Sequence, residues 1–167
     1  MAKRLIIVRH GKSDQRQNGR SDFERILNHR GNKNALEMAE RLAKKQLIPE
    51  FIISSPAKRA LTTAKHFSEA WDIQKDTIQL EPSIYEANTT ALLNVLNGLD
   101  NQYEYIALFG HNPGLTDFTN FLADAHIYNI PTAGIVIIDF PFEDWTMVSQ
   151  HTGSLFLFDC PKNAEAC

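Results

Sequence analysis

The first residues of the chain that could do chemistry are Arg9 and His10, which come directly after a short apolar run. Residues 5–8 read Leu-Ile-Ile-Val and are followed by Arg-His-Gly. An unbroken apolar run of this length is typical of a strand that is buried on both faces inside a parallel sheet. Ligands of open α/β sheets bind beyond the carboxyl ends of such strands. We therefore predict that His10 is a nucleophile and that Arg9 contacts an anion.

Two later segments repeat this arrangement of a buried strand followed by polar residues. The apolar run at 51–53 stops at Ser-Ser-Pro, and Arg59 follows in the first turn of the next expected helix. The run at 105–109 ends in Gly-His, which places His111 at a strand end as well. If these strands are parallel, their carboxyl ends meet at one edge of the sheet, and the polar side chains converge there.

Two arginines and two histidines at one edge predict a site for a tetrahedral dianion. A guanidinium group binds phosphate through two parallel hydrogen bonds. Arg59 would also lie near a helix N-terminus, where free N–H groups and the helix dipole favour anions. We expect Ser55 to be the N-cap of that helix, with Pro56 at its first position.

Strands and helices alternate along the sequence, which predicts one α/β domain over residues 1–167. The expected architecture is a three-layer α/β/α sandwich around a mostly parallel central sheet with an antiparallel edge strand. Residues 145–150 alternate between apolar and polar side chains, so we expect them to form that edge strand, and residues 155–158 to pack back on the domain. The other expected strands are 5–8, 51–53, 77–80, 105–109 and 134–138, and helices are expected after Gly31, from Pro56 to about Trp71, from Thr89 to Leu99 and from Leu115 to Ala123.

Composition and charge limit the classes of partner. The formal net charge of −3 at pH 7 gives no overall attraction to nucleic acid or to anionic lipid. The apolar run near the N-terminus is shorter than that of a signal peptide or a membrane span. We therefore expect a cytoplasmic protein without a nucleic-acid or membrane partner. We also expect Cys160 and Cys167 to be free thiols, and without a nearby histidine they are a poor metal site.

Three of these segments together resemble motifs of the histidine phosphatase superfamily. The resemblance rests on Val8-Arg9-His10-Gly11, Ser55-Pro56-x-x-Arg59-Ala60 and Gly110-His111-Asn112-Pro113-Gly114. Residues 22–31, which read Asp-Phe-x-Arg-x-Leu-x-x-Arg-Gly, and the short chain are most similar to the SixA-type phosphohistidine phosphatases. The resemblance covers nearly the whole chain and implies a single histidine phosphatase domain with a phosphoglycerate mutase-like fold.

The resemblance also implies a role for each matched residue. His10, in the Arg-His-Gly motif, matches the nucleophile that becomes phosphorylated. Arg9, Arg25 and Arg59 match phosphate-binding arginines, and His111 matches the second histidine of the pocket. The implied reaction needs no metal and no cofactor, because cationic side chains stabilise the charge on the phosphoryl group as it is transferred.

Phosphoryl transfer through a histidine sets requirements on His10 itself. An imidazole attacks only through an unprotonated nitrogen. Its other nitrogen should donate to a backbone carbonyl, which fixes the tautomer. Neighbouring arginines disfavour the imidazolium, so we expect His10 to be neutral.

The sequence leaves the substrate open between two kinds of phosphoryl compound. Phosphohistidine on a protein is the substrate implied by the resemblance, and a small phosphorylated metabolite is the alternative. The alcohol of a phosphate monoester departs as an alkoxide and requires a general acid, for which Glu86 is the candidate. The leaving group of a phosphoramidate departs with little help from an acid. The first motif continues here as Lys12-Ser13, where other branches often carry an acidic residue, and we expect this departure to affect substrate choice more than chemistry.

Two alternative functions belong to other classes of protein: a phosphate-binding module without turnover and a metal-dependent hydrolase. Every catalytic position of the motifs is filled, which disfavours the first, and no His/Asp/Glu cluster has metal-ligand spacing, which disfavours the second. The alternative for Arg25 is an exposed ion pair with Asp22 or Glu24. We interpret the remaining histidines as structural or exposed: His29, His66, His126 and His151.

Overall fold

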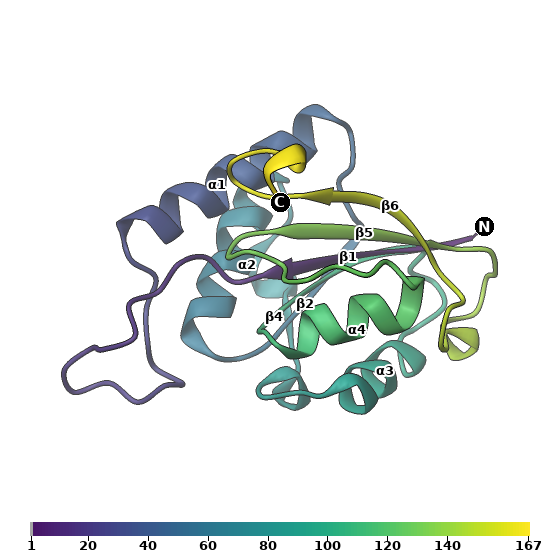
Figure 1. Cartoon of the computed structure of the whole chain (residues 1–167), viewed down its shortest axis with the longest axis horizontal. Coiled ribbons are helices and arrows are strands. Elements are labelled where there is room, and N and C mark those ends of the chain that lie inside the picture. The colour runs from purple at the N-terminus through teal and green to yellow at the C-terminus, as the bar shows by residue number, and fades with distance from the viewer. Residues whose placement is uncertain (1) are drawn as a thin grey trace.

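The computed structural model of the protein describes residues 2–167, and within them six strands form one sheet (Figure 1). The strand order across the sheet is β3-β2-β4-β1-β5-β6. Strands β1 to β4 are parallel to one another, β5 is antiparallel to β1, and β6 is antiparallel to β5. The bounds are β1 Lys3–Arg9, β2 Phe51–Ser54, β3 Gln79–Leu80, β4 Tyr105–Gly110, β5 Ile135–Phe140 and β6 Ser154–Asp159.

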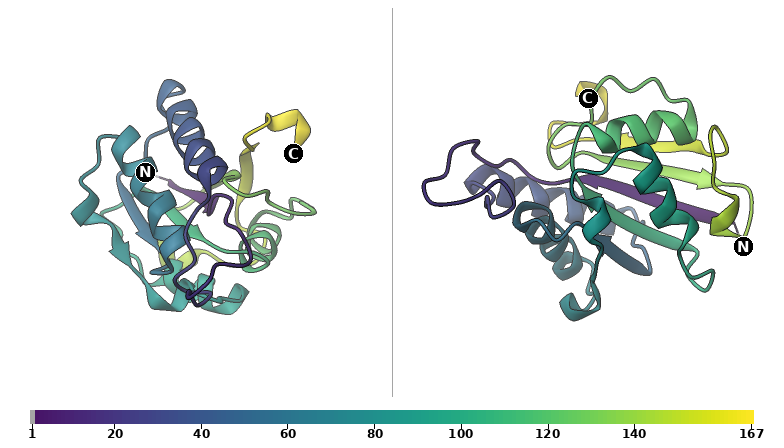
Figure 2. Two further views of the ribbon diagram at one scale, coloured as in Figure 1. Left: turned by 90° about the vertical axis from the view of Figure 1, so that its left-hand side faces the viewer. Right: turned by 90° about the horizontal axis from the view of Figure 1, so that it is seen from below.

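Two pairs of helices cover the two faces of the sheet, which gives the three-layer sandwich expected from the sequence (Figures 1 and 2). Helices α1 (His29–Lys44) and α2 (Lys58–Ala70) pack on one face, and α3 (Thr89–Asn97) and α4 (Gly114–Ala123) pack on the other. Alternate residues of β1 face opposite layers, so that Ile6 and Val8 contact the α1/α2 layer and Leu5 and Ile7 contact the α3/α4 layer. A central strand buried on both faces explains why residues 5–8 are apolar without interruption.

The edge strand does pair antiparallel with its neighbour β5, but its position in the sequence was predicted wrongly. Residues 145–147 form a 3₁₀ helix, η3 (Trp145–Met147), and the edge strand is β6. The Asp144 side chain accepts from the Thr146 backbone N at 2.9 Å, and Asn97 of α3 donates to the Trp145 and Val148 carbonyls. These contacts satisfy backbone groups that a strand would have used. The segment therefore packs in the α3/α4 layer and does not add a strand to the sheet.

Two further local predictions need correction. The third strand is shorter than residues 77–80, because Lys75–Thr77 forms a 3₁₀ helix, η1, before β3. Ser55 is not the N-cap of α2: the helix begins at Lys58 after Ala57, whose side chain makes no capping bond. The Ser55 hydroxyl accepts from the Ala57 N–H at 3.2 Å and is otherwise directed at His111.

The prediction of free cysteines was also wrong, because Cys160 and Cys167 form a disulfide. A 3₁₀ turn, η4 (Ala164–Ala166), folds the chain back after β6, and the Asn163 side chain caps it by accepting from the Ala166 N–H at 2.9 Å. The turn brings the two Cα atoms to 6.0 Å, within the range that a disulfide requires. Between residues 2 and 167, none of the helices is both long enough and apolar enough to cross a membrane.

Candidate active site

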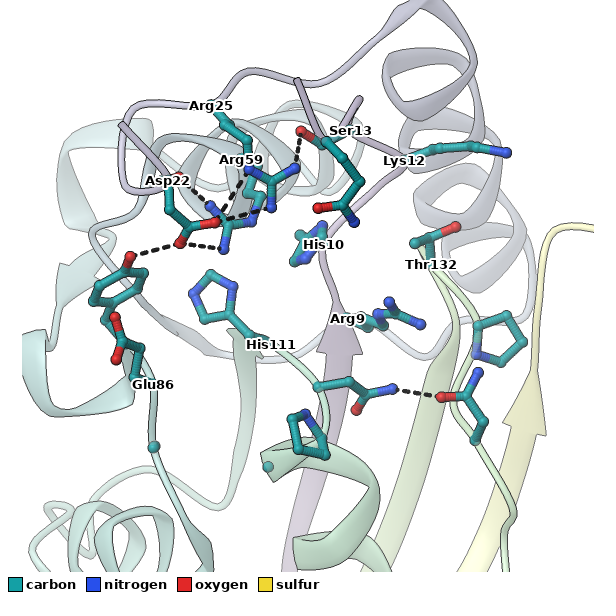
Figure 3. Close-up of a pocket in the computed structure, with 18 of the residues that line it drawn as sticks. Arg9, His10, Lys12, Ser13, Asp22, Arg25, Arg59, Glu86, His111 and Thr132 are labelled. Atoms are coloured by element: carbon teal, nitrogen blue, oxygen red, sulfur yellow. Dashed lines mark hydrogen bonds and ion pairs between the residues drawn. The ribbon is translucent and has the colours of Figure 1, made fainter. Parts of the chain in front are cut away.

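The carboxyl ends of β1, β2 and β4 meet at one edge of the sheet, as the sequence predicted. Arg9 pairs with Gly110 in the β1–β4 ladder, and Ser54 pairs with Phe109 in the β2–β4 ladder. A pocket of about 1050 Å³ opens at this edge (Figure 3). Its lining includes every residue that the sequence proposed for the site: Arg9, His10, Arg25, Arg59, Glu86 and His111.

His10 is buried at the floor of the pocket, with 8% of its surface exposed. Its Nδ1 lies 2.7 Å from the Gly11 carbonyl oxygen. A carbonyl can only accept, so Nδ1 carries the proton and Nε2 is the unprotonated nitrogen. Burial lowers the pKa of His10 to about 4, with Arg59, Arg9 and Arg25 adding to the effect and the Gly11 hydrogen bond opposing it. His10 is therefore a neutral imidazole at pH 7.

The glycine after His10 is required by close backbone packing. A Cβ on Gly11 would lie 2.6 Å from the carbonyl oxygen of Gly31, in the first turn of α1. The Gly11 N–H donates to the Thr63 hydroxyl of α2 at 2.9 Å. Both helices of one layer thus fix the backbone that presents His10.

His111 faces His10 across the pocket, with ring centroids 5.3 Å apart. Its Nε2 lies 2.7 Å from the Ser55 hydroxyl, at the end of β2. Burial lowers the pKa of His111 to about 3, and electrostatic interactions with His10 and Arg59 add to this. Its Nδ1 is buried and has no hydrogen-bond partner among the described residues. No sequence pattern links Ser55 to His111, because the two residues are 56 positions apart in the chain.

Three guanidinium groups reach the pocket from three separate segments. Arg9 is the last residue of β1 and donates from Nη1 to the Ile130 carbonyl at 2.8 Å, while burial lowers its pKa. Arg59 comes from the first turn of α2 and is 5% exposed. The Nε atoms of both arginines are buried and, within residues 2–167, unpartnered. Donors that are desolvated and unsatisfied favour the binding of an anion.

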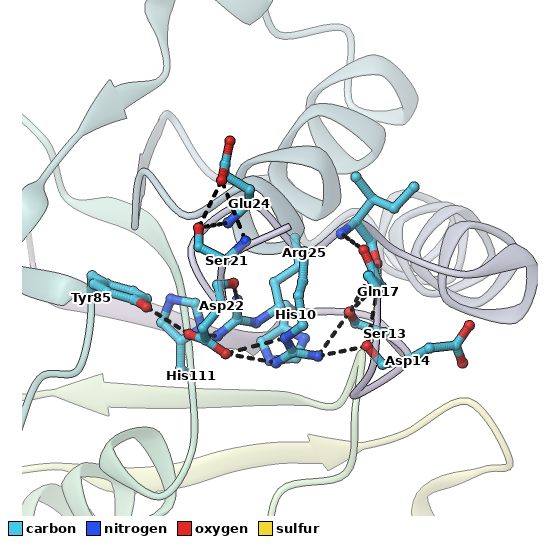
Figure 4. Close-up of polar contacts among 12 residues, drawn as sticks. His10, Ser13, Asp14, Gln17, Ser21, Asp22, Glu24, Arg25, Tyr85 and His111 are labelled. Carbon is cyan, nitrogen blue, oxygen red and sulfur yellow. Dashed lines mark hydrogen bonds and ion pairs between the residues drawn. The ribbon is translucent and has the colours of Figure 1, made fainter. Parts of the chain in front are cut away.

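Arg25 enters the pocket from the irregular loop between β1 and α1 (Figure 4). It donates from Nη1 to the Ser13 hydroxyl and to the Asp14 carbonyl, each at 3.1 Å. It also pairs with Asp22, as the alternative reading proposed, but the pair lies in the pocket wall and Arg25 is buried.

Two residues that the sequence analysis did not assign to the phosphate site lie beside these arginines. The Asp22 carboxylate contacts both Arg25 and Arg59 and accepts from the Tyr85 hydroxyl at 2.6 Å. The Tyr85 hydrogen bond, then the arginines, hold the pKa of Asp22 at about 2, and the same bond raises the pKa of Tyr85 to about 12. Asp22 was visible in the 22–31 motif, but nothing in the sequence pointed to Tyr85.

Glu86 lines the pocket on the His111 side, between the 3₁₀ helix η2 (Pro82–Ile84) and α3 (Figure 3). Its φ of 56° lies in the left-handed region, which costs a non-glycine residue on the order of 1 kcal/mol. Strained backbone of this kind clusters at functional sites.

The four other histidines lie outside the residues that line this pocket. His66 contacts Asn32, while His126 and His151 both approach Asp124 on the surface. In the described part of the chain, no group of three or more His, Cys, Asp and Glu side chains is arranged to hold a metal ion.

The sequence of the chain matches a known protein family and one curated relative. The sequence model of the histidine phosphatase superfamily (branch 1) matches residues 5–95. An uncharacterised chloroplastic protein of Arabidopsis thaliana is 27% identical over 135 residues, covering 76% of this chain and 62% of that protein, so the chain spans less than two thirds of that relative.

Solved structures with the same fold include two SixA proteins. A SixA from Agrobacterium tumefaciens superposes with a TM-score of 0.80 at 23% identity, and the protein histidine phosphatase SixA in complex with tungstate does so with 0.80 at 18%; each covers 95% of this chain and 97% of that chain. A mycobacterial glucosyl-3-phosphoglycerate phosphatase gives 0.66 at 16%, covering 93% and 97%. These likenesses confirm the expected phosphoglycerate mutase-like fold.

Proposed function

This chain belongs to the histidine phosphatase superfamily, and on that basis we propose that it is a metal-independent phosphatase that forms a phosphohistidine intermediate on His10. The single observation that carries the proposal is the state of His10. It is neutral and buried, its proton is held on Nδ1 by the Gly11 carbonyl, and guanidinium groups surround it. A neutral imidazole with a free Nε2 is the form that attacks phosphorus.

The proposed reaction has two steps. In the first, the Nε2 lone pair of His10 attacks phosphorus while the bond from phosphorus to the leaving group breaks, and the leaving group takes the bonding electrons and a proton from solvent water. In the second, water attacks the phosphorus, the P–Nε2 bond breaks and its electrons return to His10, which releases inorganic phosphate. Arg9, Arg25, Arg59 and His111 stabilise the charge on the equatorial oxygens in both steps.

We propose phosphohistidine on a protein as the substrate, with a phosphorylated partner protein as the implied partner. The imidazole of phosphohistidine is a good leaving group, so the enzyme needs no strong general acid. The likeness in fold to SixA proteins supports this choice, although the fold is shared with the phosphatase of glucosyl-3-phosphoglycerate. The second candidate is a monoesterase acting on a small metabolite. It is favoured by Glu86, a carboxyl group that lines the pocket where a leaving group could take up a proton.

Phosphoryl transfer to His10 is tested with a ³²P-labelled phosphoramidate donor in the presence of EDTA. The wild-type protein should acquire a label that is labile to acid and stable to base, and should release it as inorganic phosphate. His10→Ala should acquire none, while the control His29→Ala, outside the pocket, should label like the wild type. A label that survives in His10→Ala, or labelling that EDTA abolishes, would contradict the proposal.

A further inference from the structure

We infer that Asp22 is a positioning residue, whose carboxylate holds Arg25 and Arg59 in the orientation in which they bind the phosphoryl group. The inference deepens the proposed function and rests on it for the identity of the bound group. It concerns a residue that does not touch the reacting atoms and acts through the two arginines.

The carboxylate of Asp22 bridges the two guanidinium groups directly (Figure 3). Oδ1 accepts from Arg25 Nε and lies within an ion-pair distance of Nη2, both at 3.2 Å. Oδ2 accepts from Arg59 Nη2 at 3.2 Å, and the Asp22 backbone carbonyl accepts from Arg59 Nη1 at 2.6 Å. One residue therefore contacts the arginine of the loop and the arginine of α2 together.

Tyr85, which directly follows η2, holds the Asp22 carboxylate in position. Its hydroxyl donates to Asp22 Oδ2 at 2.6 Å, and its ring packs edge-on against Phe23, with centroids 5.1 Å apart. The loop that carries Asp22 and Arg25 has no helix or strand of its own between residues 10 and 28. Contacts with a neighbouring segment are what keep such a loop in one conformation.

The bridge leaves donors free for a ligand. A guanidinium group has five N–H donors, and Asp22 takes one from each Nη of Arg59. The Nε of Arg59 remains buried without a partner among the described residues. The contacts with Asp22 thus hold the Arg59 guanidinium in place and leave its Nε donor available to a ligand.

Charge in the pocket fits the same interpretation. Arg9, Arg25 and Arg59 would repel one another in a buried site, and the Asp22 carboxylate between two of them offsets that repulsion. The opposite interpretation is that Asp22 competes with phosphate for the arginines, and it predicts an effect of opposite sign.

Affinity for inorganic orthophosphate, measured by calorimetry, separates the two interpretations. Asp22→Asn should weaken orthophosphate binding by roughly 10- to 100-fold, by analogy with the loss of metal affinity when a residue that orients metal ligands is removed. The matched control is Glu24→Gln, which removes one negative charge from the same loop. Glu24 bonds Ser21 and not an arginine, so this variant should bind like the wild type.

Coupling between the residues tests whether Asp22 acts through Arg25. In an Arg25→Gln background, Asp22→Asn should weaken orthophosphate binding by a clearly smaller factor than in the wild type. Asp22→Glu, which keeps the carboxylate, should recover part of the affinity. Because the Asp22 side chain is 55% exposed, we expect these variants to fold, and their urea unfolding midpoints verify it.

Unchanged or tighter orthophosphate binding in Asp22→Asn would overturn the inference, as would an equal loss in Glu24→Gln. Orthophosphate binding requires no turnover, so this result is independent of the labelling of His10. If His10 fails to label while Asp22→Asn weakens orthophosphate binding, the proposed function falls and the positioning role stands. If His10 labels and orthophosphate binding is unaffected, the positioning role falls alone.

Discussion

Acidification probes the buried, neutral state of His10 and has a calculable effect on folding. The pKa of His10 is about 4 in the folded protein, against 6.5 for an ordinary histidine, chiefly because the ring is buried. As pH falls below 6.5, the unfolded chain binds a proton at this position while the folded protein does not. Stability contributed by the unprotonated ring is therefore complete above pH 6.5 and is lost as pH falls from 6.5 towards 4.

The size of this loss follows from the two pKa values. A pH of 4.5 lies two units below the pKa of this histidine in the unfolded chain, so the unfolded form is almost fully protonated. In the folded protein His10 is still mostly neutral at that pH. At 1.36 kcal/mol per unit, the free energy of unfolding falls by about 2.5 kcal/mol relative to pH 7. Replacing His10 by Asn removes this contribution, because asparagine does not titrate.

Urea unfolding of the wild type and of His10→Asn, each at pH 7 and at pH 4.5, measures the effect. The wild type should lose about 2.5 kcal/mol more than the variant between the two pH values. The carboxylates and the other histidines are common to both proteins, and His10 is still mostly neutral at pH 4.5, so its effect on His111 is small and these contributions largely cancel. Equal losses in the two proteins would refute the argument that His10 is held neutral by the fold.

Two further substitutions test individual contacts in the pocket. Ser55→Ala removes the hydroxyl beside His111 Nε2, so kcat should fall by about 10-fold with KM little changed, while Ser54→Ala, whose hydroxyl bonds only a backbone carbonyl, should behave like the wild type in the same assay. Glu86→Gln should lower kcat for an alkyl phosphate by roughly 10²- to 10⁴-fold and leave phosphohistidine turnover intact, if Glu86 is a general acid. Equal losses on both substrates would assign Glu86 another role.

Much of the fold followed from the sequence because its signals are local. Strands β1, β2, β4 and β5 are apolar runs of the length that buried strands have, and the polar residues at the ends of β1, β2 and β4 indicated the edge where the pocket lies. The layers followed from the alternation of strands and helices. The convergence of His10, Arg59 and His111 then required only that β1, β2 and β4 be parallel, and they are.

The features that could not be predicted from the sequence depend on contacts between residues that lie far apart along the chain. Residues 145–150 alternate like a strand, but Asn97 takes the backbone carbonyls that a strand would have paired. The hydroxyl of Ser55 suits a helix cap by its type, yet it bonds His111, 56 residues away. The contact of Tyr85 with Asp22 spans 63 residues and leaves no pattern in either segment.

Because β5 is antiparallel to β1, a further segment of the chain lies at the edge of the sheet where the pocket opens. Strand β5 runs against β1, so it starts at the edge where β1, β2 and β4 end. The approach to β5 therefore becomes a wall of the pocket, including Asn129, Pro131 and Thr132, and its Ile130 carbonyl holds Arg9. A forward-running strand would have delivered that approach to the far side of the molecule. Insertions or exchanges in this segment can thus reshape the entrance to the pocket while the strands and crossover helices keep their register.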